Sequence, residues 1–297
     1  MYTKHFGLHE PPFGITPDTS YFYACPIYQR ALNTLLVAAN SGEGFIKIIG
    51  EVGTGKTLLC RKFLSVLGPE FVTAYIPNPM LQPRGLMLAL ADELRVTVAG
   101  DLDEFQIIKA INYRLLMLAK NGKRVLLCID EAQAMPLETL ESVRLLTNLE
   151  TEKRKLLQIV LFGQPELDRK LAQESIRQLN QRITFQYRLG LLDRAETVSY
   201  IRHRLKVAGV ESDLFSPSAM TALHRASRGV PRLLNILAHK ALMQVYGEGG
   251  SKVAERHVLA AAGDTPTARH PLPMALVWGA GAVFLLVIAG VTGMVLQ

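Results

Sequence analysis

The chain has 297 residues, of which 49% are hydrophobic and 20% are charged. This is enough for one large domain and a smaller one with packed cores, and the composition excludes a disordered or low-complexity protein. Three cysteines (Cys25, Cys60 and Cys128) match no zinc-ligand spacing, which favours a reduced intracellular domain.

The formal net charge is +7, which by itself permits a nucleic-acid partner, an acidic lipid surface or no specific partner. Lys and Arg are scattered along the sequence, and the densest basic run, Lys153-Arg154-Lys155, is short. The pattern therefore favours a solvated face or attraction to a membrane surface over a nucleic-acid groove.

The N-terminal stretch lacks the long apolar core of a signal peptide. Residues 1–24 contain several prolines and predict an extended, structured lead-in, and the apolar spacing of residues 27–39 predicts a helix.

The segment that follows has the P-loop pattern G-x-x-x-x-G-K-[ST] at every fixed position. An apolar strand over 45–49 precedes it, and a helix over 58–67 follows it. The glycines allow amide N–H groups to turn toward phosphate oxygens. Lys56 would place a cation on the β- and γ-phosphates, and the Thr57 hydroxyl would bind Mg²⁺. We therefore expect ATP and Mg²⁺ here, with a simple Gly-rich turn as the alternative. The predicted nucleotide-binding residues are Gly50, Glu51, Val52, Gly53, Thr54, Gly55, Lys56 and Thr57.

A second acidic motif follows the apolar run 125–129, which is typical of a strand buried on both faces. Asp130 and Glu131 stand at its end, where doubly wound sheets bind ligands. This matches a Walker B strand, in which Asp130 would hold Mg²⁺, usually through water, and Glu131 would act as general base. The alternative is a core strand with acidic residues at its exit.

Further elements are predicted as strands over 71–76, 156–162 and 183–189 and helices over 84–95, 102–120, 137–152 and 165–181. Gln164, after the strand 156–162, is a candidate to touch the γ-phosphate or the attacking water, or a turn amide. Arg182 is a candidate to complete a neighbouring subunit's site, with Arg177 as the alternative. A helix end decorated with cations is equally compatible with these arginines.

From residue 191 onward the strand signals stop. Residues 193–208, 216–228, 231–246 and 252–262 predict helices and hence a small helical domain. Arg232, next to a proline typical of a helix start, is a candidate nucleotide sensor.

The C-terminal stretch 274–296 has 23 residues without charge, enough to span a bilayer as one helix. Arg269 precedes it, which predicts a cytoplasmic N-terminal part. The expected organisation is therefore an α/β nucleotide-binding domain with its lead-in over 1–190, a helical lid over 191–262, a linker over 263–273 and a transmembrane helix over 274–296.

Six motifs in fixed order carry a family resemblance: GEVGTGKT, VLLCIDEAQ, LTNLET, LFGQPEL, QLNQRI and GVPRLLN. Together with the lead-in FGLHEPPFGITPDTSYFY, they resemble the AAA+ ATPases of the ExeA/GspA group, and within it most those of mannose-sensitive haemagglutinin (MSHA) pilus biogenesis. The resemblance implies a three-layer α/β fold with a helical lid, a homo-oligomer, Arg182 as finger and Arg232 as second sensor. ExeA-type members also carry a peptidoglycan-binding domain beyond the membrane span, where this sequence ends, so we expect a cell-wall contact only if a partner protein supplies it.

Three functions remain open at this point. The first is a single-pass inner-membrane ATPase that works with pilus or secretion assembly proteins. The second is a DNA-handling ATPase of the transposition-helper type, which the basic charge fits and a membrane span argues against. The third is a nucleotide-dependent scaffold with little turnover, which Glu131 argues against.

Overall fold

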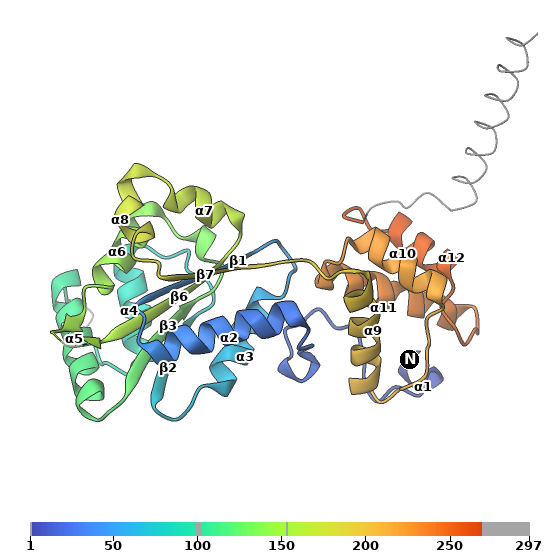
Figure 1. Ribbon diagram of the computed structural model, residues 1–297, viewed down its shortest axis with the longest axis horizontal. Coiled ribbons are helices and arrows are strands. Elements are labelled where there is room, and N and C mark those ends of the chain that lie inside the picture. Colours follow the sequence, from blue (N-terminus) through green and yellow to red (C-terminus); the bar gives the residue numbers. More distant parts are fainter. Residues whose placement is uncertain (1, 99–101, 153, 269–297) are drawn as a thin grey trace, which may run out of the picture. The chain divides into compact units, whose positions relative to one another are not determined.

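The computed structural model describes residues 2–98, 102–152 and 154–268. The chain divides into two compact units (Figure 1). An α/β unit comprises Ile15–Leu191. A helical unit combines the N-terminal segment up to Gly14 with the described residues from Leu192 to Ala268.

A five-stranded, wholly parallel sheet forms the centre of the α/β unit. Every residue of the central strands β1 and β6 is buried, as their mainly apolar sequences predict. The two polar exceptions have partners: Lys47 pairs with Asp168, and the Gln158 amide donates to the Glu43 carbonyl. All strands point the same way, so their carboxyl ends share one edge of the sheet. In spatial order the strands are β2 (Phe71–Ile76), β3 (Arg124–Ile129), β6 (Leu157–Gly163), β1 (Phe45–Gly50) and β7 (Phe185–Leu189).

Helices cover both faces of this sheet and make three layers (Figure 1). Helices α2 (Pro26–Ser41) and α3 (Lys56–Val66) pack on one face, against β1, β6 and β7. The other face packs against α4 (Pro83–Glu93), α5 (Glu104–Lys120) and α6 (Leu137–Leu146) in one continuous apolar core. The predicted three-layer α/β arrangement is therefore confirmed.

Two predicted helices are shorter than the sequence pattern suggested. The helix expected over 137–152 ends at Leu146, and a small hairpin follows it, with strands β4 (Glu150–Thr151) and β5 (Arg154–Lys155). The helix expected over 165–181 breaks into three pieces, because polar residues separate its apolar anchors: α7 (Pro165–Leu171), the 3-10 turn η3 (Glu174–Ile176) and α8 (Arg177–Asn180).

The helical unit contains α9 (Arg194–Val207), α10 (Pro217–Ser227), α11 (Pro231–Gly247) and α12 (Glu255–Gly263). Gly229, between α10 and α11, must be glycine. A Cβ there would lie 1.9 Å from the Leu192 carbonyl oxygen. The backbone N–H of Leu192 also donates a hydrogen bond to the Gly229 carbonyl, which holds the two segments close together. Tight packing therefore fixes the start of α11, next to Arg232.

The N-terminal lead-in belongs to this helical unit as far as Gly14, and not to the nucleotide-binding domain in which the sequence placed it. It begins with the short helix α1 (Tyr2–His5). The guanidinium of Arg204, which is only 5% exposed, donates hydrogen bonds to the carbonyls of Pro12 and Gly14. Phe13 packs edge-on against Phe215 with the ring centroids 5.9 Å apart. Buried tertiary contacts of this kind leave no periodic signal in the sequence.

Within residues 2–98, 102–152 and 154–268, no helix has the length and apolar character needed to cross a bilayer. The span predicted over 274–296 and the end of the predicted linker lie outside the described residues.

Candidate functional site

The P-loop connects β1 to α3 at the carboxyl edge of the sheet. Gly50 closes the strand, and a Cβ there would lie 2.6 Å from Thr54 Oγ1 and 3.1 Å from Leu189 Cβ, so no larger residue fits. Gly55 caps α3 with φ of 85°, a left-handed conformation that favours glycine. The loop thus ends at a helix N-terminus, where free amide groups and the helix dipole attract phosphate.

The Lys56 side chain lies inside this loop. Its ammonium donates hydrogen bonds to the carbonyls of Gly50 (2.9 Å) and Glu51 (3.0 Å), and the residue is 4% exposed. Burial lowers the pKa of Lys56, and the carboxylates of Glu131 and Asp130 oppose that effect. The cation is therefore fixed within the loop by backbone carbonyls and nearby acidic groups.

Asp130 joins the P-loop to the strand β3. Its carboxylate Oδ2 accepts a 2.6 Å hydrogen bond from the Thr57 hydroxyl, and its Oδ1 accepts one of 2.9 Å from the Glu131 amide. Burial raises the pKa of Asp130, and the bonds from Thr57 and the Glu131 backbone act in the opposite direction. The two residues expected at a metal site are thus in direct contact.

Glu131 lies at the same edge in an unusual backbone conformation, with φ of 49°. A non-glycine residue in the left-handed region is strained, and such residues gather at functional sites. Its Oε2 accepts hydrogen bonds from the side-chain amides of Gln133 and Gln164, the latter at 3.0 Å. The backbone N–H of Gln164 in turn donates to Gln133 Oε1 at 3.0 Å. Two amides therefore orient one carboxylate.

Sequence reasoning placed Gln164 near this site but missed three neighbours. Gln133 follows two residues after Glu131, a proximity that could have suggested it. Tyr28 of α2 donates a 2.5 Å hydrogen bond to the Thr54 carbonyl of the P-loop, and Tyr75 of β2 donates one of 3.5 Å to Asp130 Oδ2. Neither tyrosine belongs to a motif, so only the packing of α2 and β2 brings them here.

Arg182 lies at the opposite, amino edge of the sheet. It precedes β7, and its guanidinium donates to the Thr147 hydroxyl at the end of α6. Because β7 pairs in parallel with β1, Phe185 lies beside Ile46 and Leu189 beside Gly50. Those four strand steps alone span about 13 Å, so Arg182 and the P-loop of the same chain are at opposite ends of the strand pair. Arg177 is an exposed residue that begins α8.

Arg232 is the second residue of α11 in the helical unit, and its side chain is exposed. Its role as a nucleotide sensor stays a prediction.

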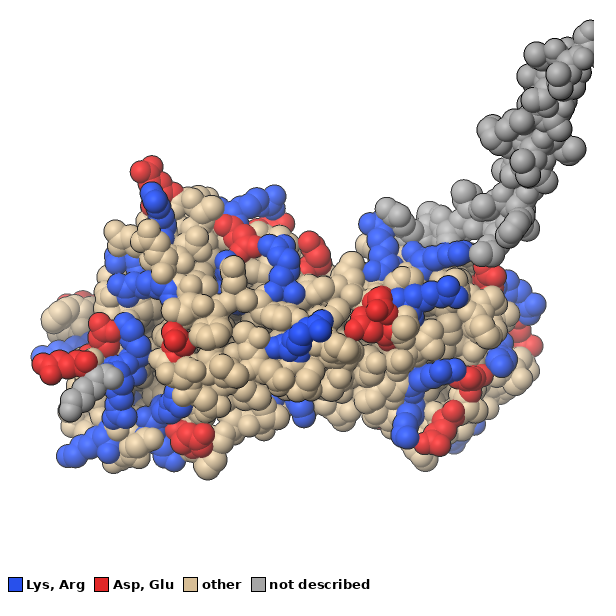
Figure 2. Space-filling model, in the orientation of Figure 1, with Lys and Arg blue, Asp and Glu red and all other residues tan. Residues whose placement is uncertain are grey.

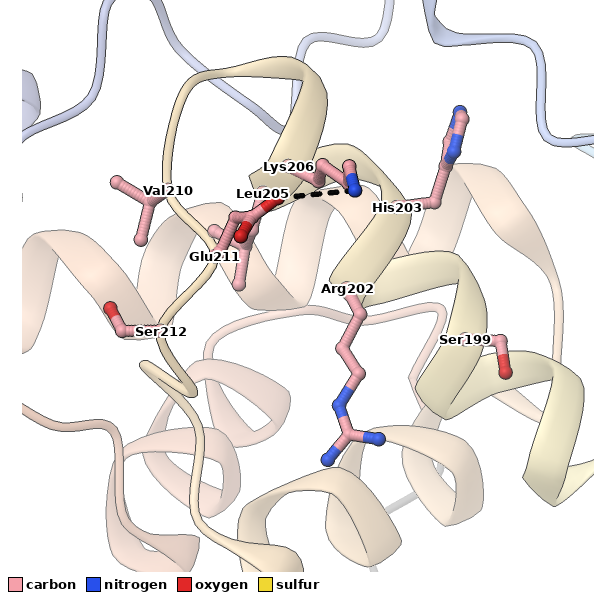
Figure 3. Close-up of a pocket in the computed structure, with 8 residues that line it drawn as sticks. All are labelled: Ser199, Arg202, His203, Leu205, Lys206, Val210, Glu211 and Ser212. Atoms are coloured by element: carbon pink, nitrogen blue, oxygen red, sulfur yellow. Dashed lines mark ion pairs between the residues drawn. The ribbon is translucent and has the colours of Figure 1, made fainter.

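A hollow of about 480 Å³ lies on α9 in the helical unit (Figure 3). Its charged side chains form ion pairs, Lys206 with Glu211 at 3.1 Å and Arg202 with Asp213 at 3.0 Å. No glycine-rich phosphate loop lines it, so it does not resemble the site at the sheet edge.

The residues at the sheet edge fit a magnesium nucleotide. Mg²⁺ prefers oxygen ligands and usually keeps waters and substrate phosphates in its shell, so one hydroxyl and one carboxylate suffice from the protein. The contact between Thr57 and Asp130 provides this pair. The described part of the chain contains no group of three His, Cys, Asp or Glu side chains that could hold a metal by itself.

Comparison with known proteins agrees with this fold. Residues 39–171 match the family model of the AAA domain. The chain is 43% identical over 262 residues to General secretion pathway protein A of Aeromonas hydrophila, covering 88% of this chain and 48% of that protein. It therefore spans about half the length of that relative. This similarity confirms the expected resemblance to the ExeA/GspA group.

Solved structures with the same fold include the ORC2 protein of Aeropyrum pernix, with a TM-score of 0.63 and 15% identity over 88% of this chain and 74% of that one. Cdc6p of Pyrobaculum aerophilum has a TM-score of 0.64 and 16% identity over 82% of this chain and 70% of that one. At such identities the likeness establishes the P-loop AAA+ fold and nothing further.

Proposed function

We propose that this chain is an AAA+ P-loop ATPase of the ExeA/GspA group and that it hydrolyses ATP at the inner membrane to support assembly of a secretion or type IV pilus machine. The observation that carries the hydrolytic part is the convergence of Lys56, Thr57, Asp130 and Glu131 at one edge of the sheet.

Each of these side chains has a separate task in the proposed reaction. The P-loop amides and Lys56 hold the β- and γ-phosphates, and Thr57 with Asp130 holds the metal. Bound Mg²⁺ neutralises negative charge on the phosphates. Glu131 accepts a proton from the attacking water, and the amides of Gln133 and Gln164 keep its carboxylate oriented.

Arg182 acts in a neighbouring copy of the chain. Its place at the amino edge separates it from the P-loop of its own chain, and a cation that approaches the γ-phosphate from another subunit stabilises the transition-state charge. The active form is therefore a homo-oligomer with shared sites. Arg232 reports the nucleotide state to the helical unit.

The role in a secretion or pilus machine is proposed from the similarity to the Aeromonas hydrophila relative and from the amino-acid sequence. The relative is named for general secretion, the resemblance to MSHA pilus ATPases favours a type IV pilus, and the apolar stretch 274–296 would anchor the chain with its N-terminal part in the cytoplasm.

The test is ATP hydrolysis by the full chain, purified in detergent, as a function of protein concentration, with the Lys56→Ala variant as control. Specific activity that rises with concentration and vanishes in the variant supports a motor with shared sites. Tight ATP binding with negligible turnover at every concentration rejects the hydrolytic mechanism and points to a scaffold.

A DNA-handling function is supported only by the net charge of +7. Salt-sensitive binding to duplex DNA, with a slope that reflects several phosphate contacts, would establish it. Its absence together with membrane retention of the full chain favours the secretion or pilus role.

A further inference from the structure

Helix α5 of the α/β unit is apolar on two opposite sides. One side packs into the core through Ile107, Ile111, Leu115, Leu118 and Ala119. The other side exposes Phe105 (75%), Tyr113 (68%), Leu116 (42%) and Met117 (40%) to solvent. A surface helix usually places charged and polar residues on its outer face, so this apolar stripe requires a separate explanation.

Two lysines lie on the same outer face. Lys109 stands four residues from both Phe105 and Tyr113, and Lys120 stands four residues after Leu116, spacings that place helical residues side by side. Among the described residues, neither lysine forms an ion pair. The exposed positions of the last three turns are thus Lys109, Tyr113, Leu116, Met117 and Lys120, without a carboxylate.

The acidic groups near this surface lie at its margins. Asp103 and Glu104 are at the N-terminal end of α5, where the Asp103 carboxylate caps the helix through the Gln106 amide. The neighbouring helix α4 carries exposed Asp92 and Glu93, and Glu93 accepts a 2.8 Å hydrogen bond from the Tyr75 amide. The C-terminal part of the face therefore keeps its positive charge.

Further basic residues extend the face beyond the end of α5. The guanidinium of Arg154 on β5 donates to the Ala119 carbonyl, which places the hairpin beside the last turn of α5. Lys123 follows, with its ammonium 2.9 Å from the Pro69 carbonyl. Figure 2 shows Lys and Arg side chains, with some acidic ones among them, over the end of the α/β unit where Figure 1 labels α5. Arg154 thus adds positive charge beside the last turn of α5, whereas Lys155 on the same strand is paired with Glu150.

We propose that the outer face of α5 lies on the surface of a bilayer that contains anionic phospholipids. The aromatic and aliphatic side chains enter the boundary between headgroups and acyl chains, and the lysines reach the lipid phosphates through their flexible stems. Anionic lipids attract such basic groups within a Debye length of the surface.

Charge complementarity favours this occupant over a second copy of the chain. A two-fold contact of the face with itself would bring Lys109 and Lys120 against the same two lysines of the partner, without a carboxylate to balance them. The contact goes beyond the proposed function, because it belongs to the α/β unit and not to the predicted span over 274–296. Two separate membrane contacts, here the predicted span and the outer face of α5, hold a protein at a bilayer more firmly than one.

Brominated-lipid quenching of a single tryptophan tests the proposal on the full chain in nanodiscs. The native Trp278 is replaced in a Trp278→Phe background, and Tyr113→Trp then reports on α5. The matched control is Val66→Trp, an exposed position (42%) on α3, which covers the other face of the sheet. Discs contain phosphatidylcholine alone or with phosphatidylglycerol, at equal bromine content.

We expect quenching and a blue shift of the tryptophan at position 113 only in discs with phosphatidylglycerol, and no quenching at position 66. Replacing Lys109 and Lys120 by Gln should lower the equilibrium constant for docking of α5 on the anionic lipid surface about fivefold for each lysine. The control Lys252→Gln, in the helical unit, should leave this constant unchanged. High salt should act like the lysine variants.

Equal quenching at the two positions, or equal quenching without phosphatidylglycerol, overturns the proposal. So does an oligomer in detergent that Tyr113→Ser with Leu116→Ser dissociates, because the face is then an interface between copies. ATP hydrolysis is measured on the same discs. Absence of quenching at position 113 together with intact hydrolysis rejects only the membrane contact of α5. Quenching at position 113 without hydrolysis rejects only the proposed ATPase activity.

Discussion

The two units of the chain use buried polar groups for different purposes. In the α/β unit, Lys56 and Asp130 are buried at the carboxyl edge of the sheet, where their contacts form the candidate site. In the helical unit, Arg204 and Asn235 are buried in the interior, and both donate hydrogen bonds to the Gly14 carbonyl. These two groups of the first unit lie at the candidate site, and these two of the second hold an N-terminal segment.

The units also differ in their titratable side chains. All seven histidines of the sequence lie outside residues 15–191, so the α/β unit has no group that titrates near pH 6.5 by its ordinary pKa. We therefore expect substitutions in the α/β unit to change ATP hydrolysis. We expect the pH dependence of stability between pH 5.5 and 7 to come from the helical unit.

The largest effect is expected from Lys56→Ala. Removal of the cation inside the P-loop leaves the phosphate charge unbalanced, so both nucleotide binding and hydrolysis should be lost while the fold persists. A fluorescent ATP analogue and the hydrolysis rate measure the two effects, and circular dichroism checks the fold. Retained turnover in this variant would falsify the site.

Arg182→Ala should reduce kcat by about a thousandfold or more with little change in nucleotide binding, because the arginine stabilises the transition-state charge. Mixing this variant with Lys56→Ala sharpens the test. Each inactive chain supplies the part that the other lacks, so mixed oligomers should regain activity if the sites are shared. Arg177→Ala serves as the matched control and should remain active.

Glu131→Gln should reduce turnover by about a hundredfold or more, the usual contribution of a general base, while ATP binding is preserved. The isosteric amide keeps the size of the side chain but cannot accept the proton. Single-turnover kinetics separates the chemical step from product release. An unchanged rate would remove Glu131 from the mechanism and favour the scaffold.

Arg204→Met should destabilise the helical unit by about 3 kcal/mol, because two carbonyl hydrogen bonds to a charged group are lost. Hydrogen exchange should become faster in residues 2–14 and in α9 and stay unchanged in the central strands. Lys206→Met, an exposed substitution on the same helix, is the control. Equal acceleration in both units would contradict the division described above.

The smallest effect is a pH dependence confined to the helical unit. Burial lowers the pKa values of His203, His224 and His239 from their ordinary value of 6.5. Above that pH these groups are neutral in both states, so they contribute no pH dependence. As the pH falls below about 6.5 the unfolded chain binds protons first, and stability is lost until the folded pKa values are passed.

Hydrogen exchange at pH 7 and pH 5.5, corrected for the intrinsic rate, measures this difference. The helical unit should show lower protection at the lower pH, and the α/β unit should not. A larger loss in the central strands than in α9–α11 would contradict the assignment.

The strands and the P-loop were predictable because their signals are local. Runs that are apolar at nearly every position specify buried parallel strands, and a glycine pattern before Lys56 specifies one loop geometry. The broken helix before Arg182 was not predictable to the same degree, because polar residues such as Gln173 and Glu174 interrupt a helix only when tertiary packing favours a turn.

The sequence by itself determined the α/β class, the P-loop with the candidate Walker residues and the approximate order of the elements, because each depends on neighbours within a few positions. Tertiary structure alone decided that the N-terminal segment up to Gly14 joins the helical unit, that the Gln164 amide donates to Glu131, and that Arg182 lies at the opposite edge from the P-loop. These contacts join residues far apart in the chain, and their energies depend on burial and orientation that no local pattern encodes.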